Sequence, residues 1–389
     1  MPRSIWLLAA IQALAMSGGA TMVLAGGIVG AGLAPSSELA TLPVAMMIVG
    51  TACGILPMTR SMRVFGRKAV FIGASCLASL AAILAAYATI SLQFSVFLIA
   101  SFLLGLCIAA FQQIRFAAIE SVPPELGAKA TSTVLLGGLF AAFLGPELAS
   151  LGQNMLSTPF AGSFVLVAVT CLACMLLFTF SKNAVEIEAP RQFEIRSRGA
   201  IARQPMFIVA ASTSVIGFAL MSFIMTATPV HMHVMQDFSL EQTKWVIQSH
   251  IIAMYLPSFI SGFLIQRIGV NTVIKIGLFI YVLTMSIGLV GEGWLSYWSA
   301  LVLLGLGWNL LFLAGTVLLS ESHVREERFK AQGLHDTLVF CAQAIAALSA
   351  GVLLAVLGWK GLMFVSFFCI AIHITILVSQ NKQLERSRV

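Results

Sequence analysis

Three ionisable side chains, Arg115, Glu147 and His250, stand inside long apolar stretches of the sequence. A charged group in lipid costs at least about 2.5–3.5 kcal/mol on insertion scales, so each of them needs a partner or a task. Burial disfavours the charged form of a carboxyl group, and histidine titrates near neutral pH. Glu147 and His250 are therefore candidates for taking up and releasing a proton. A structural hydrogen bond and substrate recognition remain the alternatives for Glu147.

Uncharged polar side chains in apolar stretches are the candidates for holding a solute. Trp308 and Asn309 are adjacent in a glycine-rich stretch, and an indole beside an amide can stack on and hydrogen-bond a planar solute. Helix packing is the alternative for this pair. The other candidates are Gln12, Ser17, Gln112, Gln113, Ser212 and Ser214.

Long apolar helices must position these side chains, because the composition excludes most soluble folds. Of the 389 residues, 59% are hydrophobic and 10% are charged, whereas a soluble protein carries roughly 25% charged residues. A membrane-spanning helix takes about 20 apolar residues. The apolar runs predict an all-α polytopic membrane protein with twelve spans, at about 4–30, 38–59, 69–90, 94–119, 128–155, 161–181, 206–230, 242–265, 272–291, 297–320, 332–357 and 360–380.

The lysines and arginines predict which side of the membrane each loop faces. All 22 except Arg115, Lys244 and Lys360 lie in the loops and tails on the side of the N terminus, and such loops are cytoplasmic by the positive-inside rule. Both termini are therefore predicted to be cytoplasmic. The same asymmetry accounts for the net charge of +7, so no nucleic-acid partner is expected.

The sequence repeats itself at an offset of about 200 residues. The matches are Leu103–Leu106 with Leu303–Leu306, Glu120-Ser121 with Glu321-Ser322, Glu125 with Glu326, and Lys129-Ala130 with Lys330-Ala331. They fall at equivalent places in two six-helix halves, residues 1–181 and 206–389, which the polar linker 182–205 joins. Duplicated halves are typical of transporters in which the halves rock about a central site.

Three short motifs carry a family resemblance. Residues 63–68 (RVFGRK) and 262–269 (GFLIQRIG) resemble the loop signature of the major facilitator superfamily and its weaker echo in the second half. Gly137-Gly138, followed by Leu144-Gly145-Pro146, resembles the glycine-proline motif of the superfamily's drug/proton antiporters. The resemblance implies two pseudo-symmetric six-helix bundles and alternating access around a midplane cavity, lined mainly by spans one, four, seven and ten.

The loop motifs depart from the family pattern at an acidic position, and this departure suggests a gate. Arg63 and Gln266 stand where the family has an acid that faces the start of span eleven. Asp336 lies in the first turn of that span, so we expect Arg63 to approach Asp336 when the cytoplasmic side is closed. A simple N-terminal acid, stabilised by the helix dipole, is the alternative. Arg267 of the second loop is assigned to the same gate.

The resemblance also suggests roles for Arg67 and for the ionisable groups inside the spans. Arg67 matches a family arginine that pairs with an acid at the end of span four, where Glu120 stands, and a structural role is favoured for this pair. Spans five and eight face each other in this fold, so Glu147 and His250 could form a proton-loading pair beside Gln248. Arg115 loosely resembles an arginine near the antiporters' proton site; an arginine paired with Glu120 at the boundary is the alternative.

Metal, redox and enzymatic chemistry have weaker support. His231, Met232, His233 and Met235 could bind a soft metal ion, but an ordinary interfacial loop is favoured. The seven cysteines lie in apolar runs and are interpreted as buried, including Cys171 and Cys174. No P-loop, G-x-S-x-G or H-E-x-x-H motif occurs, so we expect no ATP-driven step, no enzyme, no metal and no cofactor.

The sequence thus predicts a monomeric secondary transporter in the bacterial inner membrane. Its expected partners are a small organic solute, protons and the lipid bilayer. The span-five motif favours export of a drug or metabolite. Uptake of a metabolite or vitamin-like aromatic compound, for which Trp308 and Asn309 are natural contacts, is the first alternative. A receptor or sensor built on the same scaffold is the alternative of another class.

Overall fold

The computed structural model describes residues 1–123, 126–181, 196–324 and 327–386, with the backbone alone at 119–120, 127–129, 131–132, 135, 262, 328–329 and 381–386. Within these ranges all regular secondary structure is helical. The first helices are α1 (Arg3–Thr21), the π-helical turn η1 (Met22–Gly26), α2 (Gly27–Leu33), the 3₁₀ turn η2 (Ser37–Leu39), α3 (Leu42–Phe65), α4 (Arg67–Ile90), α5 (Phe94–Phe111), α6 (Ile114–Glu120), α7 (Gly127–Gly152) and α8 (Ala161–Phe180). The others are α9 (Arg198–Ala202), α10 (Pro205–Pro229), the π-helical turn η4 (Val230–Met235), α11 (Leu240–Tyr255), α12 (Ser258–Ile268), α13 (Val270–Val290), α14 (Trp294–Glu321) and α15 (Arg328–Arg386).

The helices coincide with the predicted spans. Nine helical segments of the described part of the chain are long and apolar enough to cross a membrane. One of them, Lys330–Gln380, covers two predicted spans, which Gly358 separates with non-helical backbone angles. The predicted span 128–155 holds a shorter apolar helix, Leu136–Gly152, and the span 242–265 is divided between α11 and α12. The prediction of an all-α polytopic membrane protein is confirmed.

Contacts between helices group the chain into two compact units. The first comprises Met1–Glu188 and Thr226–Gln248, and the second comprises Ala189–Met225 and Ser249–Val389. This grouping follows spatial contacts, whereas the predicted division at 182–205 follows the sequence repeat. The end of α10, the turn η4 and the start of α11 therefore belong with the first unit by their packing.

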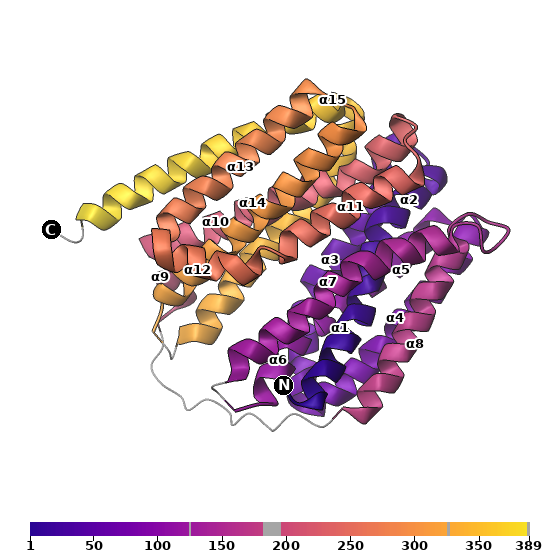
Figure 1. Cartoon of the computed structure of the whole chain (residues 1–389), viewed down its shortest axis with the longest axis horizontal. Coiled ribbons are helices and arrows are strands. Elements are labelled where there is room, and N and C mark those ends of the chain that lie inside the picture. The colour runs from indigo at the N-terminus through magenta and orange to yellow at the C-terminus, as the bar shows by residue number, and fades with distance from the viewer. Residues whose placement is uncertain (124–125, 182–195, 325–326, 387–389) are drawn as a thin grey trace. The chain divides into compact units, whose positions relative to one another are not determined.

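In the first unit, α1 packs against α7 and α8, and α3 packs against α5 (Figure 1). The motif glycines of α7 make this packing close, since a Cβ atom on Gly145 would lie 2.6 Å from the Ser17 carbonyl oxygen of α1. Thr21 Oγ1 donates a 2.8 Å hydrogen bond to the Gly145 carbonyl across the same interface. Small residues let membrane helices approach in this way, so the glycine motif has a packing role here.

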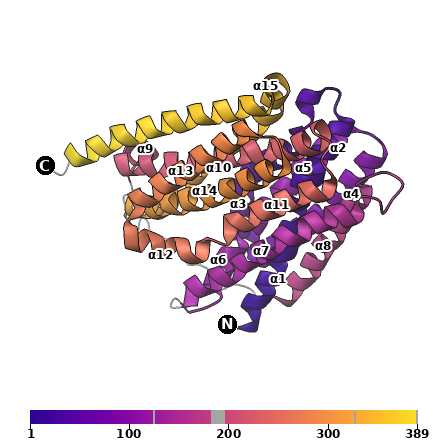
Figure 2. The same cartoon turned by 45° about the horizontal axis from the view of Figure 1, so that its top comes forward.

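In the second unit, α13 lies between α14 and α15, and α13 runs beside the C-terminal part of α15 in both views (Figures 1 and 2).

The sequence repeat has a structural counterpart at the two loop motifs. Gly66 has φ 80° and ψ 154°, and Gly269 has φ 84° and ψ 151°. Positive φ favours glycine, which explains why both halves carry one at this turn.

Candidate functional site

Trp308 and four other aromatic residues form a cluster in the second unit. The Trp308 indole stacks on Phe312, one turn along α14, with ring centroids 5.1 Å apart and planes 15° apart. Phe218 of α10 meets the indole edge-on at 5.1 Å, and Tyr255 of α11 does so at 6.2 Å. Phe340 of α15 contacts Phe218 at 6.1 Å. We call these residues the Trp308 cluster; it unites four helices that are distant in sequence.

The Trp308 cluster holds a hydrogen-bond donor that meets no acceptor in the described part of the chain. Trp308 is 5% exposed, and its Nε1 has no hydrogen-bond partner among the residues that the structure describes. Buried N–H groups in proteins nearly always have a partner, because leaving one unpaired costs about 1–3 kcal/mol. Ser214 Oγ, one turn before Phe218 on α10, is buried and similarly unpartnered within the described ranges. The cluster therefore holds aromatic rings beside a buried N–H that an acceptor on a bound solute can engage.

Asn309, the predicted partner of Trp308, has its amide engaged by protein. Its Nδ2 donates to the Met254 carbonyl at 2.8 Å and to Ser258 Oγ at 2.6 Å, and its Oδ1 accepts from Ser261 Oγ at 2.6 Å. These partners lie on both sides of the break between α11 and α12, where Pro257 cannot donate a backbone hydrogen bond. The contacts of Asn309 favour the helix-packing alternative.

The predicted polar contacts of the first unit lie on α1 and at a helix break. Gln12 is buried on α1, and its Oε1 has no partner among the described residues. Gln112 and Gln113 are half-buried at the break between α5 and α6. The Arg115 guanidinium on α6 lies 4.8 Å from the centre of the Phe116 ring. A substrate role for these residues stays a prediction, as does a coupling role for Arg115.

Glu147 belongs to a cluster of charged side chains. Gln248 was predicted in this cluster from the sequence, but Lys244 and Glu241 were not. Lys244 Nζ of α11 lies 3.0 Å from Glu147 Oε1 and 2.8 Å from Glu241 Oε2. Gln248 Nε2 donates to Glu147 Oε1 at 3.4 Å and to the Phe143 carbonyl at 3.3 Å. Lys244 stands at the start of the predicted span 242–265 and was not proposed as a partner of Glu147, yet it is only 5% exposed. Its spacing of three from Glu241 was visible in the sequence, but its approach to α7 was not.

His250 lies in the second unit and is fully buried. Its Nδ1 forms a 2.7 Å hydrogen bond with the Leu301 carbonyl of α14. The partners that the structure gives Glu147 are Lys244 and Gln248. Proton loading by Glu147 and His250 stays a prediction, now with a lysine beside the carboxylate.

The predicted gate residues lie at helix ends. Arg63 is in the last turn of α3, Arg67 begins α4, and Arg267 is in the last turn of α12. Asp336 Oδ1 lies 3.1 Å from Nδ1 of its neighbour His335. The side chain of Glu120 lies outside the described residues. The pairings of Arg63 with Asp336 and of Arg67 with Glu120 stay predictions.

The segment of η4 was considered for metal binding. His231 and Met232 are buried, and His233 Nδ1 forms a 2.7 Å hydrogen bond with the Phe238 carbonyl. No group of three or more metal-ligating side chains occurs among the residues described by the structure. The segment is a helical turn that continues α10 and not the loop that the sequence favoured, and the metal-binding alternative stays untested.

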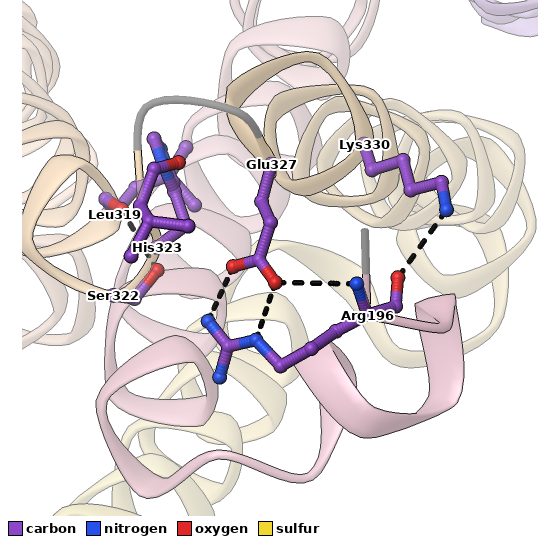
Figure 3. A network of polar contacts seen from close by, with 7 residues as sticks. Arg196, Leu319, Ser322, His323, Glu327 and Lys330 are labelled. Carbon is purple, nitrogen blue, oxygen red and sulfur yellow. Dashed lines mark hydrogen bonds and ion pairs between the residues drawn. The ribbon is translucent and has the colours of Figure 1, made fainter. Parts of the chain in front are cut away.

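An ion pair between an exposed arginine and a buried glutamate ties the segment before α9 to the loop between α14 and α15. The Arg196 guanidinium donates two hydrogen bonds to the Glu327 carboxylate, and the Arg196 backbone N–H donates a third at 3.4 Å (Figure 3). Lys330 Nζ donates to the Arg196 carbonyl at 3.3 Å. Hydrogen bonding from Arg196 lowers the pKa of Glu327 from 4.5 to about 2. This contact attaches the described part of the polar linker, from Arg196 onward, to the loop that precedes α15.

Breaking this ion pair from its two sides should have unequal effects. Glu327 is 3% exposed, whereas the Arg196 side chain is 41% exposed. Arg196→Met leaves a carboxylate buried without its partner, so we expect a loss of roughly 3 kcal/mol of stability, the lower end for buried pairs. Glu327→Gln leaves a guanidinium that water can reach, at a cost of about 1 kcal/mol. Thermal unfolding midpoints in detergent measure both.

The pH dependence of unfolding provides a second test. Because the pKa of Glu327 is lowered on folding, the ion pair contributes its full stability above pH 4.5 and loses it as the pH falls towards about 2. Glu327→Gln should remove this part of the acid destabilisation. If Arg196→Met and Glu327→Gln lower the unfolding midpoint equally at pH 7, the difference in burial between the two side chains does not control the cost.

Comparison with known proteins identifies the family. The model of the Major Facilitator Superfamily matches residues 5–243 and 221–386. The chain belongs to this superfamily. The riboflavin transporter RfnT of Brucella anthropi is 34% identical over 383 residues, which cover 98% of this chain and 96% of the relative. The MFS-type transporter YdeG of Bacillus subtilis is 29% identical over 91% of this chain and 86% of its own length.

Solved transporter structures share the fold. The inward-open xylose transporter XylE of E. coli superposes with a TM-score of 0.74 at 12% identity, covering 96% of this chain and 95% of XylE. An inward-facing bacterial homologue of the lysosomal transporter Spinster gives a TM-score of 0.73 at 13% identity, covering 97% and 96%. The chain is therefore an MFS transporter with the superfamily's two six-helix bundles, in agreement with the sequence prediction.

Proposed function

We propose that this transporter takes up a planar, vitamin-like heteroaromatic compound, with riboflavin as the first candidate. The observation that carries the proposal is the Trp308 cluster, which offers stacked aromatic faces and a buried indole N–H without a partner among the described residues. The similarity to a riboflavin transporter over nearly the whole chain supports the same class. These findings favour the uptake alternative over the drug export that the span-five motif suggested.

The chemistry of riboflavin matches this cluster. Its three fused rings present two flat apolar faces, and the ring edge carries carbonyl and ring-nitrogen acceptors. An aromatic pair is worth about 0.5–1.5 kcal/mol beyond its buried area, and a satisfied buried donor adds about 0.5–1.5 kcal/mol. A solute without a flat ring does not gain the stacking contribution, so the cluster favours planar solutes.

The remaining parts of the proposal concern orientation and coupling. The distribution of Lys and Arg supports a position in the cytoplasmic membrane with both termini cytoplasmic. Transport is coupled to protons in this proposal, and Glu147 is the first group to examine because it is an ionisable residue within a span. The chain functions as a monomer whose duplicated halves are joined at 182–205.

Counterflow in proteoliposomes tests the substrate class. Vesicles loaded with unlabelled riboflavin should transiently accumulate labelled riboflavin, and this exchange does not depend on how the protein is oriented. Protein-free vesicles are the control, and xylose and a cationic dye are the comparison solutes. Exchange of the dye without exchange of riboflavin would restore the drug-export interpretation. Imposed pH gradients of either sign then test proton coupling.

A further inference from the structure

Lys244 has two carboxylate partners of different kinds. Glu241 precedes it by three residues on α11, so this ion pair of 2.8 Å is contained within one helical turn. Glu147 is on α7, 97 positions away in sequence, and this ion pair of 3.0 Å joins two helices. A movement of α11 away from α7 breaks the second ion pair and leaves the first intact.

The two partners change the cost of separating the helices. A buried lysine that loses its sole carboxylate leaves an uncompensated charge, which is strongly unfavourable. Lys244 is 5% exposed, but Glu241 travels with it and continues to compensate its charge. Gln248 adds hydrogen bonds to Glu147 and to the Phe143 carbonyl, so the contact is specific as well as charged.

The setting of α11 gives this contact a place in the transport cycle. Residues up to Gln248 group with the first compact unit, and residues from Ser249 group with the second, although α11 is one continuous helix. Alternating access requires some helix contacts to open and close reversibly. The contact between Glu147 and Lys244 meets this requirement, because Lys244 keeps Glu241 when it opens and the Glu147 side chain is already 45% exposed.

We propose that Glu147 and Lys244 form an exchangeable ion pair that opens and closes during transport, while Glu241 remains the permanent partner of Lys244. Glu147, Lys244 and Glu241 are then positioning residues that set the closing equilibrium and need not touch the solute. The inference rests on transport by this chain, and only its rate measurements use the proposed solute.

Cross-linking tests whether the contact must open. In the Phe143→Cys/Gln248→Cys variant, a short bifunctional methanethiosulfonate reagent should link α7 to α11, and mass spectrometry of the linked peptide excludes the native cysteines as its source. We expect riboflavin counterflow to fall at least tenfold and to recover when a reductant cleaves the link. Each single-cysteine variant, treated in the same way, is the control. Normal counterflow by the linked protein would overturn the proposal.

The yield of the link measures the closed contact without any solute. In the two-cysteine background, Glu147→Gln should lower the yield several-fold, and Glu147→Asp, which keeps the charge, should lower it less. Glu241→Gln should leave the yield equal or higher but slow counterflow, because Lys244 then loses its only partner on opening. Equal yields for all variants would refute the ion-pair role. If unmodified protein does not move riboflavin, the proposed function fails while the yields still decide this inference.

Discussion

Gly105→Ala is expected to lower the stability of the folded protein more than any other single substitution proposed for this chain. A Cβ atom at Gly105 of α5 would overlap the Met47 carbonyl oxygen of α3 and lie 2.7 Å from its carbon. Both obstacles are backbone atoms, so no side-chain rotation relieves the clash. Overpacking of a buried site costs typically 1–3 kcal/mol, and we expect about 3 kcal/mol or more because the helices themselves must move apart. Thermal midpoints and the monodisperse fraction in detergent measure the effect.

Two other glycines calibrate this expectation. Gly305, the repeat partner of Gly105, would place its Cβ 2.5 Å from the His250 carbonyl oxygen and 3.0 Å from Ala253 Cβ, so its replacement by alanine should cost less. Gly73 lies within α4 with open space around it, and alanine there should be neutral or stabilise the helix by about 0.5–1 kcal/mol. A Gly105→Ala midpoint equal to that of Gly73→Ala would show that α3 and α5 can separate freely.

The repeat shows which part of the fold is readable from sequence. The match of Leu103–Leu106 with Leu303–Leu306 includes two glycines that are both close-packed in the structure, as expected when duplicated halves place equivalent residues at equivalent contacts. The spans were predictable because lipid thickness fixes the length of an apolar helix. The division at Gly358 was predictable too, since the predicted spans 332–357 and 360–380 leave this residue between them, and its backbone angles are not helical.

Single residues of the candidate site could be identified from the sequence by their type. Contacts between helices that are distant in the sequence could not. Trp308 was identified from its type and its glycine-rich setting, but the approach of Phe218 and Tyr255 depends on helix packing. Asn309 was also identified by its type, but its amide donates hydrogen bonds to protein atoms on both sides of the break between α11 and α12. The sequence did not show these partners. The ion pair of Lys244 with Glu147 was not predictable, because the sequence does not show which neighbouring helix a lysine faces.

Trp308 substitutions are expected to have the largest effect on transport. Trp308→Phe keeps a stacking ring and removes the indole N–H, so the apparent KM for riboflavin should rise about tenfold, which corresponds to about 1.4 kcal/mol for one hydrogen bond. Trp308→Leu removes the ring as well and should raise KM about a hundredfold. Counterflow rates and the quenching of flavin fluorescence on binding measure both variants. In this proposal the site recognises a flat ring and one acceptor on it. A planar analogue without that acceptor should therefore have the same KM with the wild-type protein and with Trp308→Phe.

A second tryptophan of the same helix separates this effect from helix packing. Trp298 of α14 donates its indole N–H to Ser249 Oγ at 2.9 Å, so its donor is already used within the protein. Trp298→Phe should therefore lower stability modestly and leave the KM for riboflavin unchanged, whereas Trp308→Phe should change KM and leave stability nearly unchanged. If Trp308→Phe instead lowers the unfolding midpoint without changing KM, the cluster is a packing core, and the substrate must be recognised elsewhere.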